Sequence, residues 1–245
     1  MRRLSDLITG WRWRLSPDLD LTCSCCGSDR FRKDRVLWRE LIDEWQLSPA
    51  EVDYINLQQG VACRECGVNL RAGALAQAIM NGFGCTRLFR EFVADESFQH
   101  LAVLEINTAG QLSQYLERLP NYTFVEFPDA DMQNLEFEDG AFDLVVHSDT
   151  LEHVPQPVRG LSECARVLRT GGLCAFTVPI IVDRMTRTRD GLPPSHHGTS
   201  ENPKDYRVIT EYGADVWKDV VLAGFRECRF SALHYPAAIA LTGVK

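Results

Sequence analysis

The sequence predicts an α/β fold in which a mostly parallel sheet follows a small cysteine-rich module. At 245 residues and 45% hydrophobic composition, the chain can bury the core of one full α/β domain and a small satellite domain. Two Cys-x-x-Cys pairs lie in its first third. From about residue 99, short apolar runs alternate with segments of helical periodicity, which is the pattern of strand–helix units in a parallel sheet.

The composition argues against two classes of partner. A net charge of −8 gives no general attraction to nucleic acid, which is therefore an unlikely partner. Only the N-terminal arm, residues 1–22, is locally basic, with Arg2, Arg3, Arg12 and Arg14. No stretch approaches the roughly 18 apolar residues of a membrane span, and the first residues lack the apolar core of a secretory signal. We expect a cytoplasmic protein that does not enter a membrane; no pattern indicates its oligomeric state.

The two cysteine pairs predict a structural zinc site. Paired cysteines in a cytosolic chain point to metal before disulfides. Each pair is followed by glycine, in the runs CSCCG and CRECG, and glycine permits the positive φ that a tight metal-binding turn often needs. The predicted ligands are Cys23, Cys26, Cys63 and Cys66. Two alternatives stay open: four cysteines without metal, and Cys25 in place of Cys26.

The 36 residues between the pairs predict a helical insertion. VLWRELIDEW has helical periodicity, and Ser48, Pro49 and Glu51 then supply the N-cap, N1 proline and capping-box acid of a second helix. LRAGALAQAIM and TRLFREFV are predicted helices that connect the two domains. The expected boundaries are residues 23–84 for the zinc-binding module with its insertion and connecting helix, and residues 85–245 for the α/β domain.

The elements of the α/β domain follow in order. LAVLEI, FDLVVHS and LCAFTVP are predicted buried parallel strands, with helices over QLSQYLERL and VRGLSECARVL between them. TEYGADVWKDVVLAGF predicts a late helix that ends at Gly224, and FRECRFSAL and AAIALTGV predict two final strands.

The run EDGAFDLVVHSDTLEHVPQPVRGLSECARVLRTGGLCAFTVP resembles the central segment of class I S-adenosylmethionine-dependent methyltransferases. Strand, post-strand turn, helix and Gly-Gly strand entry come in the order of that family, and the resemblance covers roughly the last three fifths of the chain. It implies a Rossmann-like methyltransferase domain with S-adenosylmethionine across the carboxyl ends of the first strands.

The resemblance also implies the cofactor-binding residues. Glu105 takes the position of the acid at the end of the first strand, and Glu126 that of the carboxylate that binds the ribose hydroxyls. Asp131 and Met132 match the pair that contacts adenine. The turn after the first strand and the end of the FDLVVHS strand complete the set with Asn107, Ala109, Gly110, His147 and Ser148. An ordinary surface acid is the alternative for Glu126.

The chain departs from the family pattern in two places. Asn107, Ala109 and Gln111 replace the three alternating glycines of the family's turn after the first strand. Because asparagine tolerates positive φ and alanine is small, close backbone approach is expected to survive in part, with a weaker or differently placed cofactor as the alternative. Asp131 follows Glu126 by only five residues, where the family fits a helix and another strand, so we expect a sheet shortened between its second and fourth strands.

Polar residues after the FDLVVHS strand are the candidate catalytic group. Asp149, Glu152 and His153 have the spacing i, i+3 and i+4, which places them on one face of a helix. The arrangement is similar to that of ubiquinone-biosynthesis O-methyltransferases and small-RNA 2′-O-methyltransferases, where such a face holds a divalent ion. A second divalent metal, direct base catalysis by a histidine, and a purely structural histidine are the alternatives.

The polar, Pro/Gly-rich segment RMTRTRDGLPPSHHGTSENPKDY is expected to form a lid over this group. It supplies His196 and His197 as further catalytic candidates. Its Arg184, Arg187 and Arg189 would pair with a phosphate on the substrate or face solvent.

The sequence therefore predicts an S-adenosylmethionine-dependent methyltransferase that methylates a hydroxyl of a small molecule, such as a sugar or a secondary metabolite. Zinc modules precede this fold in sugar methyltransferases, which favours a small-molecule acceptor. One alternative is an RNA methyltransferase whose zinc module binds RNA, against which the acidic charge argues. Another is a non-catalytic methyltransferase-fold binding protein that has lost the cofactor with its glycines.

Overall fold

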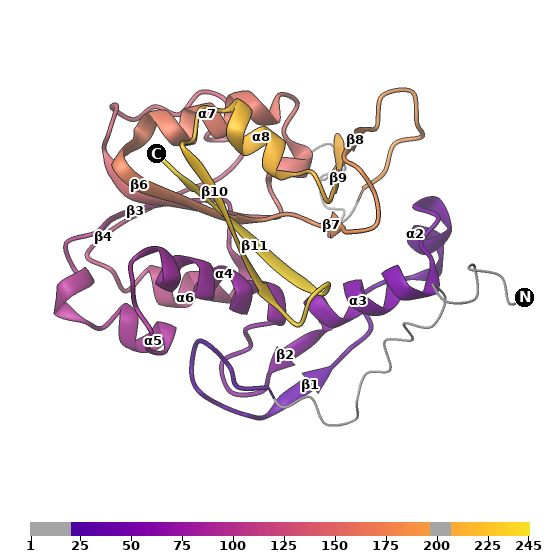
Figure 1. Ribbon diagram of the computed structural model, residues 1–245, viewed down its shortest axis with the longest axis horizontal. Helices are drawn as coiled ribbons and strands as arrows, with labels where there is room; N and C mark the ends of the chain where they lie inside the picture. The colour runs from indigo at the N-terminus through magenta and orange to yellow at the C-terminus, as the bar shows by residue number, and fades with distance from the viewer. Residues whose placement is uncertain (1–20, 197–206) are drawn as a thin grey trace, which may run out of the picture.

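The computed structural model describes residues 21–196 and 207–245 (Figure 1). Most of the N-terminal arm and the candidate His197 lie outside the described residues. A six-stranded sheet forms the centre of the molecule, with helices on both of its faces. No helix in the described part of the chain is long and apolar enough to span a membrane.

The sheet has the strand order β10-β11-β6-β5-β3-β4. Four neighbouring strands run parallel to one another: β3 (Ala102–Ile106), β4 (Asn121–Val125), β5 (Phe142–Ser148) and β6 (Leu168–Thr177). β11 (Ala238–Val244) is antiparallel to β6, and β10 (Glu227–Leu233) is antiparallel to β11. The chain passes from β4 to β5 through residues 126–141 without another helix or strand. The predicted Rossmann-like α/β class and the shortened sheet are both confirmed.

Helices bury both faces of the sheet, so its central strands are apolar on both sides. In β5, Leu144 and Val146 pack in one core with α4 (Leu70–Gly82), while Val145 packs in the other with α7 (Pro157–Val167). α8 (Trp217–Leu222) covers the same face as α7 (Figure 1). Helix α4 is thus a layer of the sheet domain, although it precedes the predicted boundary at residue 84.

Two predicted helices are shorter than expected. QLSQYLERL forms one 3-10 turn, η2 (Gly110–Leu112), and α6 (Ser113–Leu116), and TRLFREFV forms only α5 (Phe89–Phe92). The late helix is wrong in its first half, where Thr210–Gly213 forms strand β9. β9 pairs with β7 (Ile180–Ile181) and β8 (Arg187–Thr188), and this pairing outweighs the local helical pattern.

The cysteine module is a small antiparallel ribbon with a helical insertion. β1 (Phe31–Lys33) pairs with β2 (Val61–Cys63), and α2 (Arg39–Glu44) and α3 (Pro49–Gly60) lie between them in sequence. The predicted capping box is confirmed, because the Ser48 hydroxyl accepts from the Glu51 amide and the Glu51 carboxylate accepts from the Ser48 amide.

The insertion packs against the predicted lid segment. Trp45 and Tyr54 share a core with Ile181 and Val208, and the Trp45 indole N–H donates to the Ser195 hydroxyl at 2.8 Å. The three arginines of the segment bind carboxylates of the protein itself. Arg184 pairs with Glu51, Arg187 with Glu211, and Arg189 with Glu211 and Glu44. These ion pairs connect the segment to the fold, and Arg187 is the one of the three whose side chain is still exposed.

Candidate functional site

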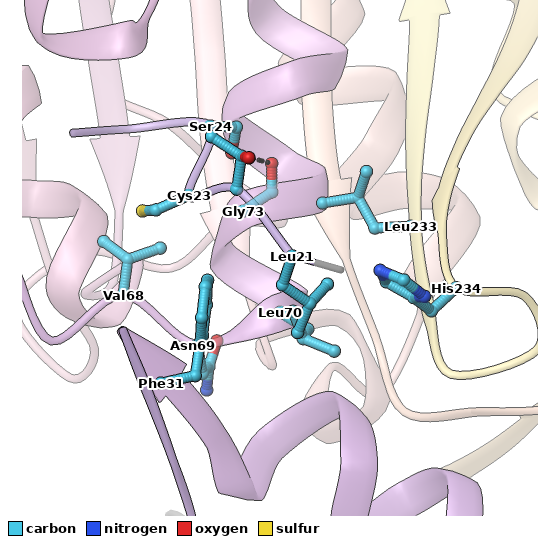
Figure 2. Close-up of a pocket in the computed structure, with 11 residues that line it drawn as sticks. Leu21, Cys23, Ser24, Phe31, Val68, Asn69, Leu70, Gly73, Leu233 and His234 are labelled. Carbon is cyan, nitrogen blue, oxygen red and sulfur yellow. Dashed lines mark hydrogen bonds between the residues drawn. The ribbon is translucent and has the colours of Figure 1, made fainter. Parts of the chain in front are cut away.

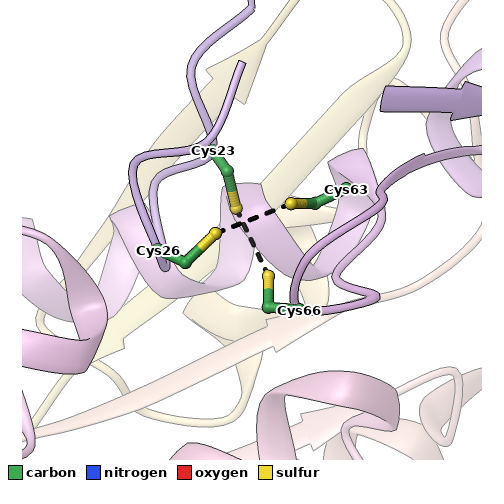
Figure 3. Close-up of side chains that lie close together, drawn as sticks. All are labelled: Cys23, Cys26, Cys63 and Cys66. Atoms are coloured by element: carbon green, nitrogen blue, oxygen red, sulfur yellow. Dashed lines mark hydrogen bonds between the residues drawn. The ribbon is translucent and has the colours of Figure 1, made fainter. Parts of the chain in front are cut away.

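The four paired cysteines converge at the base of the ribbon (Figure 3). The Sγ atoms of Cys23 and Cys66 are 3.6 Å apart, those of Cys26 and Cys63 are 3.5 Å apart, and all four lie within 4.8 Å of one another. A tetrahedron of Zn–S bonds of about 2.3 Å has S···S edges of about 3.8 Å, so the donor set fits one zinc ion. Cys25 is buried outside this group.

Both cysteine turns have the same backbone geometry. The amide of Gly27 donates to the Cys23 carbonyl, and the amide of Gly67 donates to the Cys63 carbonyl. Gly27 has φ 79° and Gly67 has φ 77°, in the left-handed region that favours glycine. The expected positive φ after each pair is confirmed.

The cysteine turns also contact the sheet domain. The Ser24 hydroxyl donates to the Gly73 carbonyl of α4 at 3.1 Å, beside a cavity of about 280 Å³ between this turn, α4 and the β10–β11 connection (Figure 2). On the other side, the side-chain amide of Gln114 donates to the Cys66 carbonyl at 2.9 Å. The module thereby holds both α4 and the segment that follows β3.

A second cavity, of about 790 Å³, opens at the carboxyl ends of β3, β4 and β5. This is the edge of an open α/β sheet where ligands bind, and the volume suits a small molecule. The cavity is lined by the segments that follow these three strands, by the start of α4 and by residues 207 and 209. Seven of the predicted cofactor residues line it: Asn107, Ala109, Gly110, Glu126, Asp131, Met132 and Ser148.

Asn107 adopts the backbone conformation that is expected of the first glycine in the family's turn. Its φ is 53°, and its backbone amide donates to the Val125 carbonyl. Its side-chain oxygen accepts from the Phe127 amide at 3.0 Å, while its side-chain amide donates to the Thr150 hydroxyl at 3.2 Å. One asparagine therefore adopts the turn conformation and ties together the ends of β3, β4 and β5.

Two predicted cofactor residues face the core instead of the cavity. The Glu105 carboxylate is buried and accepts from the Ala109 amide and from the hydroxyls of Ser113 and Tyr122, so it holds the turn in place. His147 is buried and stacks on Phe176 with ring centroids 4.7 Å apart. Burial lowers the pKa of His147 to about 3.

The adenosine-side residues lie at the cavity rim. Glu126 and Asp131 are exposed, and the Asp131 carboxylate accepts from the Gln133 amide at 2.8 Å. Met132 is buried against Gly160 of α7, where an added β-carbon would come within 3.3 Å of the methionine side chain. The rim thus offers two carboxylates beside an apolar surface.

Asp149, Glu152 and His153 do not project together into the cavity. The segment forms one 3-10 turn, η3 (Leu151–His153), which has 3.0 residues per turn instead of 3.6, and Asp149 precedes it with φ 47°. Asp149 and His153 line the cavity, whereas Glu152 is only 1% exposed and does not. The predicted i, i+4 helix face is therefore absent from this described segment.

The charges of this group are set by burial and by Arg71. Arg71 Nη2 lies 2.5 Å from Asp149 Oδ2. Burial raises the pKa of Asp149, which Arg71 and His153 oppose, and burial together with the Asp149 charge raises the pKa of Glu152 further. Burial lowers the pKa of His153, whose Nδ1 lies 3.0 Å from the Arg207 carbonyl. That carbonyl can only accept, so Nδ1 carries the proton of the neutral ring and Nε2 is the basic nitrogen.

Arg71 and Arg207 are two cavity residues that the sequence did not predict. Both line the cavity, but they reach it from α4 and from the segment before β9, and no local pattern marks them. His196 forms a β-bridge with Arg207, yet it is exposed and does not line the cavity.

Comparison with known proteins agrees with this architecture. Residues 82–176 match the family model described as a methyltransferase domain. A demethylmenaquinone methyltransferase from Clavibacter sepedonicus is 41% identical over 73 residues, which is 29% of this chain and 30% of that protein. A sarcosine/dimethylglycine N-methyltransferase from Halorhodospira halochloris is 42% identical over 59 residues, 24% of this chain and 21% of that protein. The matched segment thus spans less than a third of these curated relatives.

Solved structures show a more distant likeness. The trans-methyltransferase CalH, in complex with SAH, has a TM-score of 0.43 at 16% identity and covers 80% of this chain and 57% of its own. A possible histamine N-methyltransferase from Thermotoga maritima has a TM-score of 0.39 at 15% identity, with 71% and 89% coverage. The central segment of the chain is thus similar to a methyltransferase domain. The match to the methyltransferase-domain family model spans residues 82–176, which is less than half of this chain.

Replacing Asn107 should destabilise the turn after β3. Asn107→Ala removes two side-chain hydrogen bonds and places a less tolerant residue at positive φ, so the free energy of unfolding should fall by about 2 to 3 kcal/mol. Asn107→Gly removes the same hydrogen bonds without the strain, and its loss should be smaller by roughly 1 kcal/mol. Urea denaturation measures both, and equal losses would show that backbone strain plays no part here.

Proposed function

We propose that this chain is an S-adenosylmethionine-dependent methyltransferase that acts on a hydroxyl of a small molecule. The observation that carries the proposal is the cavity at the carboxyl ends of β3, β4 and β5, which seven of the residues assigned by resemblance line. The replaced glycines do not argue for a loss of the cofactor, because Asn107 adopts the positive φ that the turn requires.

The rim residues suit the nucleoside part of the cofactor. The Glu126 carboxylate would accept hydrogen bonds from the ribose hydroxyls, and Asp131 would accept from the adenine amino group. Met132 would pack on the adenine ring. When bound, S-adenosylmethionine supplies an electrophilic methyl group on a sulfonium.

His153 is the residue that we propose as the general base. Its lowered pKa keeps the ring neutral at pH 7, and the Arg207 carbonyl fixes the tautomer in which Nε2 can accept the proton of an acceptor hydroxyl. The Asp149 charge, which raises the pKa of His153 against the effect of burial, would then stabilise the imidazolium that forms. Asp149 is already paired with Arg71, which has the role that a divalent ion would otherwise have. Direct base catalysis is therefore favoured over a metal-assisted step.

The net charge of the chain and the position of His153 in a cavity favour a small-molecule acceptor. The net charge of −8 opposes an RNA acceptor, and His153 lies in a cavity instead of on an open surface. The curated relatives are named for chemically different acceptors, so they do not identify the acceptor of this chain.

We also propose that the four converged thiolates bind a structural zinc ion. The site is closed, since four sulfurs fill a tetrahedron, and it lies at the contacts of the module with α4 and Gln114. Its role would be to hold these two elements in place.

The cofactor proposal predicts that S-adenosylhomocysteine, the demethylated product, binds to the purified protein in calorimetry. Glu126→Ala should weaken this binding by about 1 to 3 kcal/mol, because two hydroxyl donors lose a charged acceptor. Asp129→Ala is the matched control, since Asp129 is also exposed on this segment but does not line the cavity. Equal affinities for wild-type protein and both variants would show that Glu126 makes no contact with the ribose. No binding to wild-type protein would contradict the proposed function.

The zinc proposal predicts about one zinc ion per chain in protein purified without chelator. Cys26→Ser should lose the metal and lower the thermal midpoint, because the binding free energy of a structural zinc is folding free energy. Cys25→Ser should keep the metal, since Cys25 is not one of the converged thiols. Elemental analysis measures both. Metal-free wild-type protein with an unchanged cooperative transition would contradict the proposal.

The base proposal predicts that His153→Ala lowers turnover of a methyl acceptor by about 10² to 10⁴. In the wild-type protein, turnover should fall as the pH drops through the lowered pKa of His153, below about 6.5, because protonated Nε2 cannot accept a proton. Brief chelation that leaves the structural zinc in place should not change the rate. His100→Ala, at an exposed position, is the control. A metal-dependent rate that survives His153→Ala would favour the metal-assisted alternative.

A further inference from the structure

A second group of metal-ligating side chains lies in the core between β5, β6 and α7. His147 of β5, Cys164 of α7 and Cys174 of β6 each offer one ligand atom, and these three atoms lie within 4.8 Å of one another. The three residues are 0%, 0% and 1% exposed. They are separate from the four cysteines of the ribbon, and none of them lines the large cavity. Three elements of the fold thus bring three donors to one place in its interior.

The His147 ring has no protein partner for its nitrogens. Both Nδ1 and Nε2 are buried, and no described residue hydrogen-bonds to either atom. The stack on Phe176 covers one face of the ring and involves neither nitrogen. A buried polar atom without a partner destabilises a fold, and a metal bond to one of the nitrogens would remove part of that penalty. A histidine at this position is therefore understandable if it has a ligand that the protein does not supply.

The spacing of the three ligand atoms admits a metal ion. Atoms that lie within 4.8 Å of one another share a point at most about 2.8 Å from each, and metal bonds to imidazole nitrogen and thiolate sulfur are about 2.0 to 2.3 Å long. A shift of each side chain by less than about 1 Å would therefore bring all three donors to bonding distance.

The donor set favours copper(I) over other ions. Thiolate and imidazole select zinc and copper, whereas magnesium and calcium take oxygen ligands. Structural zinc almost always has four ligands, and in the described chain no fourth His, Cys, Asp or Glu joins this group. Its burial also leaves no access for water as a fourth ligand. A trigonal set of nitrogen and sulfur donors is typical of copper, and a monovalent ion with one thiolate and a neutral imidazole has no net charge to bury.

We infer that His147, Cys164 and Cys174 form a binding site for copper(I), separate from the zinc site of the ribbon. When the Cu–S bond forms, the S–H bond of that cysteine breaks and its proton goes to solvent. No electron is transferred, because the copper stays monovalent. Since the donors are buried, the ion enters as the chain folds and then links α7 to two neighbouring strands. His147 directly precedes Ser148, so the ion fixes the strand end that forms one wall of the large cavity.

Refolding in the presence of both metals tests the inference. Denatured protein is refolded without oxygen in zinc and a slight excess of copper(I), and loosely bound copper is then removed with bathocuproine disulfonate. Elemental analysis should find about one copper and about one zinc per chain in wild-type protein. Cys174→Ala should lose the copper and keep the zinc. Cys85→Ala is the matched control and should keep both metals, because Cys85 is a buried thiol that belongs to neither group.

The copper-dependent shift in thermal midpoint gives a second readout, in which each protein is compared with its own copper-free form. Copper(I) at about 100 times its dissociation constant should raise the midpoint of wild-type and Cys85→Ala protein by about 5 to 10 °C. The midpoint of Cys174→Ala should not rise. Equal copper contents and equal shifts in wild-type and Cys174→Ala protein would overturn the inference, as would wild-type protein that retains no copper.

X-ray absorption at the copper edge identifies the ligands in wild-type protein, so it decides the inference even if Cys174→Ala does not fold. A spectrum with one nitrogen and two sulfur neighbours supports the site. Sulfur neighbours alone would place the copper in the ribbon and overturn the inference. A second zinc ion per chain that Cys174→Ala removes would overturn the assignment to copper(I).

Discussion

The short connection between the second cysteine turn and α4 is the constraint on which the site depends. Only Gly67 and Val68 separate Cys66 from Asn69, the N-cap of α4, so the turn fixes where the helix begins. The Asn69 side chain accepts from the Ala72 amide, and one helical turn then carries Arg71 to Asp149 at the end of β5. The cysteine turn also receives Gln114 from the segment after β3. The ribbon therefore sets the position of two walls of the cavity, and its folding cannot be separated from the geometry of the site.

The other walls depend on how the shortened sheet is closed. Within the described residues no strand pairs with the free edge of β4, so no neighbouring strand fixes the segment that carries Glu126 and Asp131. The Asn107 side chain supplies that constraint, because it accepts from the Phe127 amide just after Glu126. A glycine at position 107 would satisfy the turn but could not make this bond. The departure from the family's glycine pattern and the shortened sheet are thus physically linked. The Asn107 side chain fixes part of the segment after β4 that a further strand would otherwise hold.

The sequence predicted those features whose signals are local. The capping box of Ser48 and Glu51, the two cysteine turns and the buried strand β5 each depend on residues within one element, and the structure has all of them. The features that it did not predict depend on partners distant in the chain. Thr210–Gly213 became a strand because β7 and β8 offer it hydrogen bonds, and Arg184 became an internal ion pair because the insertion places Glu51 beside it. Arg71 entered the site for the same reason, since only the tertiary fold places α4 next to Asp149.

The difference between a 3-10 turn and an α-helix decides the chemistry after β5. On an α-helix, residues at i, i+3 and i+4 share one face and could have shared one ion. The tighter turn separates them, so that Glu152 faces the core while Asp149 and His153 face the cavity. Arg71 then pairs with Asp149, and in the proposed function His153 acts as a neutral base whose tautomer the Arg207 carbonyl sets. To bind all three residues, a divalent ion would have to displace Arg71 from Asp149, and the Glu152 side chain would have to leave the core. Each change would break a contact of the fold. The local backbone geometry is therefore consistent with the base-catalysed site that we propose, although the residue spacing alone permits a metal-assisted one as well.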